Sequence, residues 1–216
     1  MICCASMRDI VLASGTLFIA AAMLASCGSK KDASKANFKA AIQAELDTEP
    51  QCIVATLPRD IQSWDGRFGT DRELESLVRA GLVRRTQVMM KRSSMDWMLE
   101  DRRPKQVSGY RYDFSDTGKK YVVQVHGLMG TAPALCYGKK KVVDIVRYSE
   151  PSPAMGMTVS QVTYTWRLTD IAEWARNPEV EKTFHTQQWL ATADTPKEAQ
   201  ASLALSNDGW HVPRMF

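Results

Sequence analysis

The sequence predicts an α+β fold, in which winged-helix-like helices and a hairpin are followed by a small antiparallel sheet with short helices. Apolar residues in the segment 74–81 (LESLVRAG) recur at helical spacing and end at a glycine. The segment 162–168 (VTYTWRL) alternates apolar and polar residues, which is typical of a half-buried strand. Hydrophobic residues make up 44% of the 216 residues and include six tryptophans, so the chain has enough apolar material for a folded core.

The chain begins with an apolar segment. Residues 10–25 carry no charge and are fewer than the roughly 20 that a membrane-spanning helix needs, which favours a secretory signal. Residues 24–27 (LASC) resemble the lipobox of bacterial lipoproteins. The resemblance implies a signal peptide over residues 1–26, cleavage before Cys27, diacylation of Cys27 and acylation of the new amino terminus. Gly28 in the second position resembles the signal for sorting to the outer membrane. We therefore expect a lipid-anchored protein on its periplasmic face; an uncleaved anchor, or a plain signal with an incidental cysteine, is the alternative.

Two cysteines are left for the folded part when the signal is removed. Residues 27–36 (CGSKKDASKA) are small, polar and charged, and are predicted to be the lipidated cysteine and a short flexible tether. An exported protein enters an oxidising compartment, where Cys52 and Cys136 can form a disulfide. The alternative is two separate buried thiols, because sequence spacing does not show whether the two Cα atoms come close.

Residues 37–125 are expected to form the winged-helix-like part. The expected elements are a helix over 38–46, a strand or buried turn over 52–55, a helix capped by Thr70 or Asp71 and closed by Gly81, and a strand over 82–89. The segments LESLVRAGLV (74–83) and YDFSDTGKKY (112–121) together resemble the helix-to-wing pattern of winged-helix domains. Phe114 and Ser115 stand where that pattern usually has leucine and threonine.

Residues 126–216 are expected to form the small antiparallel sheet with helices, packed as one unit with the preceding part. The expected elements are paired strands over 141–148 and 162–168, a short helix capped by Asp170, a further helical turn after Asn177-Pro178, and an extended segment over 199–205 that ends at a turn. Lys139, Lys140 and Lys141 follow a glycine and are predicted to form a solvated turn, with a loop that faces a polyanion as the alternative.

No catalytic motif is found in the sequence. A nucleophile elbow (G-x-S-x-G) and a zinc-protease helix (H-E-x-x-H) are both absent. His126, His185 and His211 are far apart and each is flanked by apolar or aromatic residues, which favours structural histidines over ligands or bases. A metal site needs three or four ligands at useful spacing. The sequence therefore predicts no cofactor, no metal and no enzymatic activity.

Basic residues indicate a partner surface. Arg84, Arg85, Arg102 and Arg103 are its candidate residues. On a winged-helix shape such residues would usually indicate DNA, but the helix before them carries Glu73 and Glu75, and the lipobox places the chain outside the cytoplasm. The net charge of +4 is also mild for a nucleic-acid binder. We therefore expect a solvated face, or contact with anionic lipid headgroups or glycans, and no nucleic acid.

A second resemblance concerns the later part of the chain. The segments CYGKKKVVDIV (136–146), VTYTWRLTDIAEWA (162–175) and SNDGW (206–210) are similar to periplasmic lipoproteins of the carbapenem-intrinsic-resistance type and to related bacterial lipoproteins. This resemblance implies an envelope lipoprotein that protects without hydrolysing. The expected function is thus a non-enzymatic, membrane-anchored periplasmic protein that binds an envelope protein or a small molecule. The alternatives are an envelope hydrolase with a dispersed site and a regulatory protein with an uncleaved anchor.

Overall fold

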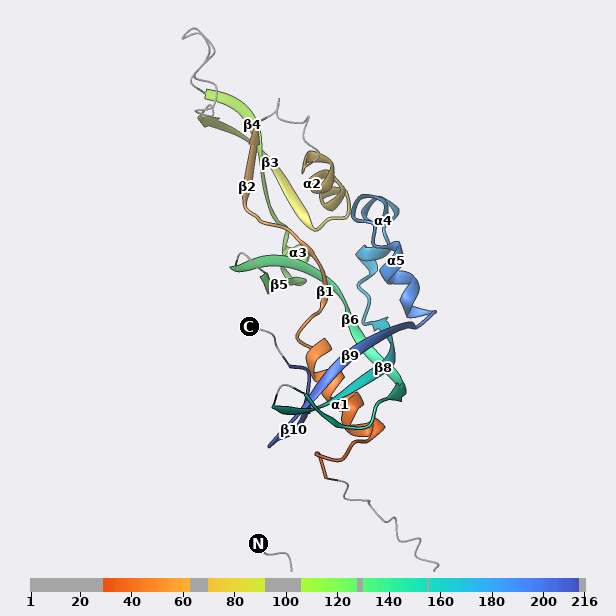
Figure 1. Ribbon diagram of the computed structural model, residues 1–216. Helices are drawn as coiled ribbons and strands as arrows, with labels where there is room; N and C mark the ends of the chain where they lie inside the picture. Colours follow the sequence, from red (N-terminus) through yellow and green to blue (C-terminus); the bar gives the residue numbers. More distant parts are fainter. Residues whose placement is uncertain (1–28, 63–69, 92–105, 128–129, 155, 214–216) are drawn as a thin grey trace, which may run out of the picture.

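A single long strand, β6 (Gly130–Tyr148), organises the larger of two antiparallel sheets (Figure 1). The computed structural model describes residues 29–62, 70–91, 106–127, 130–154 and 156–213, so Cys27 and the apolar leader lie outside it. The first half of β6 pairs with β1 and β5, and its second half pairs with β8. The other strands of this sheet are β1 (Gln51–Val54), β5 (Val122–Gly127), β7 (Ser152–Ala154), β8 (Met157–Thr169), β9 (Lys197–Ser206) and β10 (Gly209–His211).

The strand order in this sheet is β1-β6-β8-β9-β10, with β5 on β6 and β7 on β8. The predicted antiparallel pair of segments 141–148 and 162–168 is confirmed, since Ile145 lies across from Tyr164 and Val142 across from Trp166. The predicted turn near Asn207 closes the hairpin of β9 and β10.

The smaller sheet consists of β2 (Arg59–Gln62), β3 (Val83–Lys91) and β4 (Gln106–Phe114) in the order β2-β4-β3. Helix α2 (Thr70–Arg79) precedes β3 and ends as the sequence predicts. Gly81 has φ +74°, its N–H donates to the Val78 carbonyl at 2.9 Å, and the Leu82 N–H donates to the Leu77 carbonyl at 2.9 Å. This is the Schellman arrangement, in which a left-handed glycine allows the chain to satisfy the last carbonyls of a helix.

The remaining helices are α1 and several short ones. Helix α1 (Lys35–Leu46) buries Phe38 and Ile42, two residues of the predicted apolar stripe, against the larger sheet. The helices are α1 (Lys35–Leu46), α3 (Asp116–Lys119), the 3₁₀ turns Glu173–Arg176 and Ala191–Ala193, α4 (Pro178–Phe184) and α5 (Gln187–Leu190).

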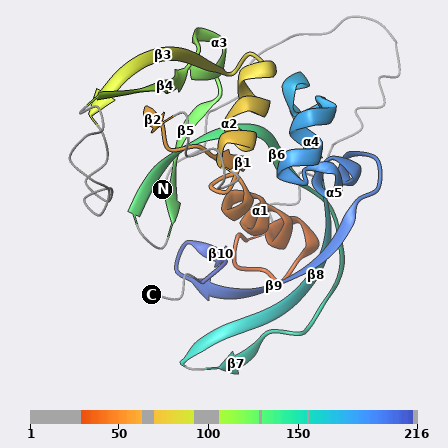
Figure 2. The same cartoon turned by 90° about the horizontal axis from the view of Figure 1, so that it is seen from above.

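Two apolar cores share the strands β6 and β8. Leu135 and Leu168 belong to the first core, which also holds α2 and α4, whereas Ile145 and Trp166 belong to the second core under α1. Figure 2 shows α1 inside the curve of β6, β8 and β9. In Figure 1 the hairpin of β3 and β4 forms one end of the molecule, and the start of α1 with β10 forms the opposite end. The fold is thus α+β as predicted, with more strand than helix.

Three local predictions are wrong. Lys139, Lys140 and Lys141 lie within strand β6 and do not form a turn. Strands β1 and β5 pair with β6 up to Gly138, and β8 pairs with it from Lys139 onward, so the strand continues through the lysines. Asp170 does not cap a helix, since it has the left-handed φ of +52° and the following 3₁₀ turn begins only at Glu173.

The third difference concerns the predicted flexible tether. From Ser29 onward the chain makes defined contacts, and α1 begins at Lys35, inside the range expected to be a tether. The side-chain amide of Asn37 donates to the carbonyls of Ser29 and Asp32, at 2.8 and 2.9 Å. The indole N–H of Trp210 donates to the carbonyls of Lys31 and Asp32, at 3.1 and 3.2 Å. The polar composition of residues 27–36 predicts flexibility, but hydrogen bonds from Asn37 and Trp210 hold the backbone of residues 29–32.

Candidate functional site

Helix α1 lies along the free edge of β6. Beyond Gly138, strand β6 pairs with β8 on one edge, and its other edge faces α1. The side-chain amide of Gln43 donates to the Lys140 carbonyl at 3.0 Å and accepts from the Val142 N–H at 2.9 Å. The Lys39 ammonium group donates to the Val143 carbonyl at 2.7 Å. The helix therefore does for this edge what a neighbouring strand would do, and satisfies backbone groups that would otherwise be unpaired.

A groove of about 800 Å³ opens between α1 and β6. One wall of the groove is a face of α1, whose lining residues recur every three or four positions. The other wall is formed by the three consecutive lysines of β6 and by the end of β8. The lining residues are Ala36, Lys39, Ala40, Gln43, Asp47, Lys139, Lys140, Lys141, Val142, Thr169 and Asp170.

The groove has an excess of positive charge. Four lysines line it, against the acidic residues Asp47 and Asp170. The Lys139 ammonium lies 3.4 Å from Asp170, and Lys140 lies 3.6 Å from Glu49, just outside the lining. The Asp47 carboxylate accepts from the Gln43 amide at 2.7 Å.

Lys141 differs from its neighbours. No ion pair joins it to another residue of the described ranges, and its side chain is exposed. In the sheet register it lies directly across from Arg167 of β8, which is also exposed. Like charges in opposite positions on neighbouring strands repel each other. An anion placed beside Lys141 would relieve this repulsion.

The chemistry of this lining suits binding. Ammonium groups can hold phosphate, carboxylate or sulfate oxygens, and the exposed Ala36 and Ala40 supply apolar contact beside them. The lining has no histidine and no cysteine, and the hydroxyl of Thr169 donates to the Lys139 carbonyl at 3.3 Å. The groove therefore offers charge and shape for a ligand but no arrangement of nucleophile and base.

A second cleft, of about 820 Å³, lies between α2 and α4. Its charges are closer to balance, because the Arg79 guanidinium is bonded to the Glu179 carboxylate at 2.6 Å and Glu73 lies in the same lining as Arg72 and Lys182. Among the three histidines and Cys136, only His185 lines this cleft. We therefore take the groove between α1 and β6 as the candidate site.

The structure places the three histidines apart. His126 is on β5, His185 follows α4 with φ +53°, and His211 is on β10; all three are exposed. They are thus surface residues, whereas their apolar neighbours had suggested structural positions. His126 Nδ1 lies 3.2 Å from the Thr131 hydroxyl. Within the described part of the chain, no three His, Cys, Asp or Glu side chains are grouped as a metal site would require.

The predicted basic partner surface is only partly described. Arg102 and Arg103 lie outside the described residues. Arg85, on β3, bonds to the Glu75 carboxylate at 2.7 Å and lies 4.7 Å from the centre of the Tyr110 ring. The hydrogen bond to Glu75 raises the pKa of the Arg85 guanidinium.

Acidic neighbours also accompany Arg84 and Arg111 of this sheet. Arg84 lies across from Asp113 in the strand register. Arg111 forms two bonds of 2.7 Å with Asp60, and these hold the pKa of that carboxyl below its usual value. A partner surface on β3 stays a prediction, with Arg84 and Arg85 set among carboxylates.

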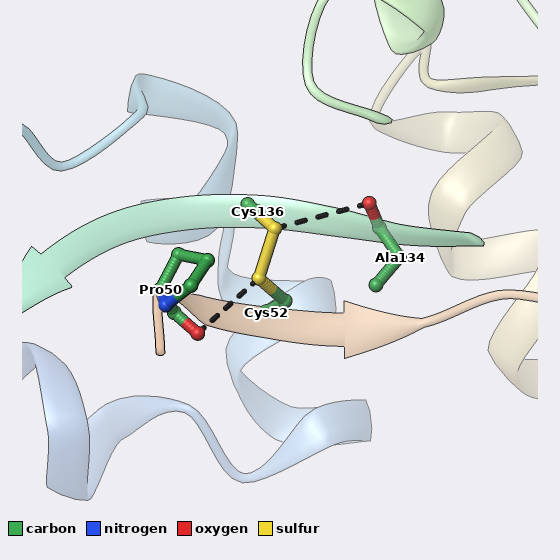
Figure 3. The surroundings of a disulfide bond; sticks show 4 residues. All are labelled: Pro50, Cys52, Ala134 and Cys136. Atoms are coloured by element: carbon green, nitrogen blue, oxygen red, sulfur yellow. Dashed lines mark hydrogen bonds between the residues drawn. A yellow bond between two sulfur atoms is a disulfide. The ribbon is translucent and has the colours of Figure 1, made fainter. Parts of the chain in front are cut away.

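Cys52 and Cys136 are joined as a disulfide in the structure (Figure 3). They are direct partners in the register of β1 and β6. Cys52 Sγ lies 3.3 Å from the Pro50 carbonyl oxygen, and Cys136 Sγ lies 3.9 Å from that of Ala134. The bridge joins residues 84 positions apart in the sequence and fixes β1, which follows α1, to the central strand.

Comparison with known proteins gives no match: no family model, no curated protein and no solved structure is similar to the chain. Among the helices of the described residues, none has the length and apolar character needed to cross a bilayer.

Sequence reasoning found only part of this groove. The run Lys139–Lys141 was noted, with a polyanion as the alternative partner. Lys39, Gln43 and Asp47 also line it, and their spacing of four residues places them on one helix face. That spacing alone does not show which strand the helix face meets.

Proposed function

We propose that this chain is a non-enzymatic lipoprotein, anchored through acylated Cys27 to the periplasmic face of the outer membrane, that binds an anionic envelope ligand in the groove between α1 and β6. The resemblance of residues 24–27 to a lipobox supports the anchor. The observation that carries the binding proposal is the meeting of four lysines, from two elements, on a groove of about 800 Å³. Only two acidic residues, Asp47 and Asp170, are among the lining residues of this groove, so an incoming anion meets an excess of positive charge.

We also propose that β2, α2, β3 and β4 form a winged-helix-like unit. The order β2-β4-β3, with α2 directly before the hairpin, supports this proposal. Helix α1 is not packed in that unit; it contacts β6, β9 and β10 instead. Nucleic acid is not the proposed partner, because Glu73 and Glu75 are on α2, and Arg85 of β3 and Arg111 of β4 are paired with carboxylates.

The anchor is tested by Cys27→Ala in the native host. We expect the variant to lose incorporation of labelled fatty acid and to leave the membrane fraction, because two or more acyl chains are needed for a stable anchor. Ser26→Ala is the matched control, since it changes the neighbouring residue and keeps the acylated thiol. Fatty-acid labelling that persists in Cys27→Ala would contradict the proposal.

The binding site is tested by calorimetric titration of the full chain with a bisphosphorylated disaccharide. The variant Lys139→Gln/Lys141→Gln removes two exposed charges, and we expect Kd to rise about tenfold or more because each lost charge-assisted contact contributes about 1 kcal/mol. Added salt should weaken binding by the native protein in the same direction.

The matched control is Lys119→Gln/Lys120→Gln, which removes the same charge from α3 and the residue after it, away from the groove lining. Its Kd should equal that of the native protein. An unchanged Kd in the groove variant, or equal affinity for the dephosphorylated disaccharide, would contradict an anion site in this groove.

The protective role that the second resemblance implies stays a prediction. It is checked by deleting the gene and measuring growth in a carbapenem. We expect greater sensitivity in the deletion strain, together with no loss of drug when the purified protein is incubated with it. Consumption of the drug would favour the hydrolase alternative.

A further inference from the structure

The described chain begins two residues after Cys27, and this bears on how the domain meets the membrane. One residue, Gly28, separates Cys27 from Ser29. Two residue steps span at most about 7 Å between Cα atoms, whatever their conformation. The acylated cysteine lies at the level of the lipid headgroups, so Ser29 must lie at that level too. This step rests on the proposed acylation of Cys27.

Ser29 is not separated from the domain by slack chain. The Ser29 N–H donates to the Asp32 carboxylate at 2.8 Å, and the Asp32 N–H donates back to the Ser29 carbonyl at 3.0 Å. Asn37 of α1 and Trp210 of β10 then hold the turn 29–32 from the domain side, through the four bonds given above. Trp210 is itself packed on Phe38, with ring centres 4.9 Å apart.

A close approach of backbone supports the same contact. A Cβ atom added to Gly209 would lie 3.0 Å from the Lys30 carbonyl oxygen, so the turn passes directly against the hairpin of β9 and β10. Gly209 also has φ +119°, which favours glycine there. The turn and the hairpin are therefore one rigid surface, and the anchor holds this surface close to the bilayer.

The side chains around this surface suit anionic headgroups. Lys30 and Lys31 are exposed on the turn, and Lys35 begins α1 with its side chain 57% exposed. Tyr148 is exposed nearby; its ring packs on Phe38 at 4.9 Å and its hydroxyl donates to the Ala33 carbonyl at 3.5 Å. Lysines near an anionic membrane surface are attracted to its headgroups. Tyrosine has the amphipathic ring that lies at headgroup level.

We infer that the end of the molecule formed by the turn 29–32 and the hairpin of β9 and β10 rests on the anionic bilayer surface. The groove between α1 and β6 begins at Ala36, one helical turn from this end, so it opens beside the headgroups. The hairpin of β3 and β4 forms the opposite end of the molecule and is held away from the bilayer (Figure 1).

The test uses the acylated full chain in vesicles of phosphatidylethanolamine and phosphatidylglycerol that carry a nickel-chelating lipid. A spin label is attached to Asn207→Cys, on the turn between β9 and β10, or to Thr86→Cys, on β3. Cys52 and Cys136 are joined and do not compete for the label. We expect nickel at the headgroups to enhance relaxation of the label at 207 and to leave the label at 86 unchanged.

Charge reversal tests the role of the lysines. In the Asn207→Cys background, Lys30→Glu/Lys31→Glu should lose much of the relaxation enhancement. The introduced glutamates and the anionic headgroups repel each other, so the domain tilts away from the bilayer and the label moves away from the nickel. Lys119→Glu/Lys120→Glu reverses the same charge elsewhere and should retain the full enhancement. Enhancement retained in the first variant would overturn the assigned role of the headgroup charge.

Mass spectrometry of the same sample distinguishes failure of the inferred orientation from failure of the proposed anchor. If Cys27 carries its lipid and the label at 207 is relaxed no more than the label at 86, the inferred orientation is overturned and the anchor stands. If Cys27 carries no lipid, the proposed anchor is overturned and the orientation with it.

Discussion

Gly118 has no side chain, and this allows α3 to lie directly against the backbone of Leu82. Its N–H donates to the Ser115 hydroxyl oxygen at 2.9 Å, and α3 thereby starts directly after β4. A Cβ atom here would overlap the carbonyl oxygen of Leu82, which accepts from the Ser115 N–H at 2.9 Å. Leu82, just before β3, and Ser115, just after β4, are joined at this point, so Gly118 has no room for a methyl group.

Gly118→Ala should therefore destabilise the protein by about 2 kcal/mol or more, because the overlapping atom is backbone that cannot rotate away. Urea unfolding monitored by tryptophan fluorescence measures the loss. Thr117→Ala, at an exposed neighbouring position, should change stability by less than about 0.5 kcal/mol. Equal unfolding midpoints for Gly118→Ala and the native protein would show that α3 can move aside.

Tyr137 is a buried titratable residue whose ionisation makes the free energy of unfolding depend on pH. Its side chain is 2% exposed, and burial raises the pKa of its hydroxyl, opposed in part by a hydrogen bond with Gln51. Burial also raises the pKa of Tyr164. A raised pKa means that the folded state favours the neutral phenol. This stabilisation is complete below the unfolded pKa of about 10 and is lost as pH rises through the higher folded pKa.

We therefore expect the free energy of unfolding to fall as pH rises above about 10. Tyr137→Phe removes one titrating hydroxyl, so its curve should be flatter than that of the native protein over the same range. Urea unfolding across a pH series measures both slopes. Parallel curves would show that Tyr137 ionises equally easily in the folded and unfolded chains.

At the scale of elements, α1 does more than bury an apolar stripe. Phe38 and Ile42 face the core, as the spacing of apolar residues predicts. A polar face of the same helix satisfies the free edge of β6, through Lys39 and Gln43. An exposed edge strand is a site for unwanted pairing with other chains. The helix thus protects the strand that carries the groove lysines.

Gln43→Ala should lower the free energy of unfolding by about 1–3 kcal/mol, because it leaves the Lys140 carbonyl and the Val142 N–H without partners. Urea unfolding measures this, and Gln124→Ala, at an exposed position on β5, is the control with an expected change near zero. Hydrogen exchange of the Val142 amide should also become faster. Unchanged exchange at Val142 would show that water or another group replaces the amide.

At the scale of the whole molecule, two cores are joined by the shared strands β6 and β8. The Cys52–Cys136 disulfide fixes β1 to the half of β6 that belongs to the first core, while α1, which precedes β1, packs on the second. The bridge therefore fixes the chain near the junction of the two cores.

Cys52→Ser/Cys136→Ser should reduce stability by about 2–4 kcal/mol, because the native bridge closes a long loop and limits the unfolded chain. Urea unfolding with and without reductant measures the effect. Reductant should shift the midpoint of the native protein and leave that of the double variant unchanged. A native midpoint that is insensitive to complete reduction, shown by thiol alkylation of the unfolded protein, would contradict a stabilising bridge.

The sequence predicted those elements whose signals are local. The helix that ends at Gly81 was predictable because only the spacing of its apolar residues and the glycine after them are needed. The strand containing residues 162–168 was predictable because alternation over neighbouring residues defines its buried face. Both signals act within a few residues, so no distant contact had to be known.

Tertiary structure decided the groove and the position of the chain's first described residues. The strand containing Lys139–Lys141 exists because β8 pairs with it, and its lysines meet Lys39 because α1 covers the other edge of that strand. The polar segment after Cys27 is held because Trp210, some 180 residues later, donates to its carbonyls. Such partners are brought together by packing of the whole chain, and local composition does not encode which distant group supplies the hydrogen bond. The sequence alone predicts an anchor and indicates an α+β fold, and the tertiary structure determined which distant groups hold residues 29–32.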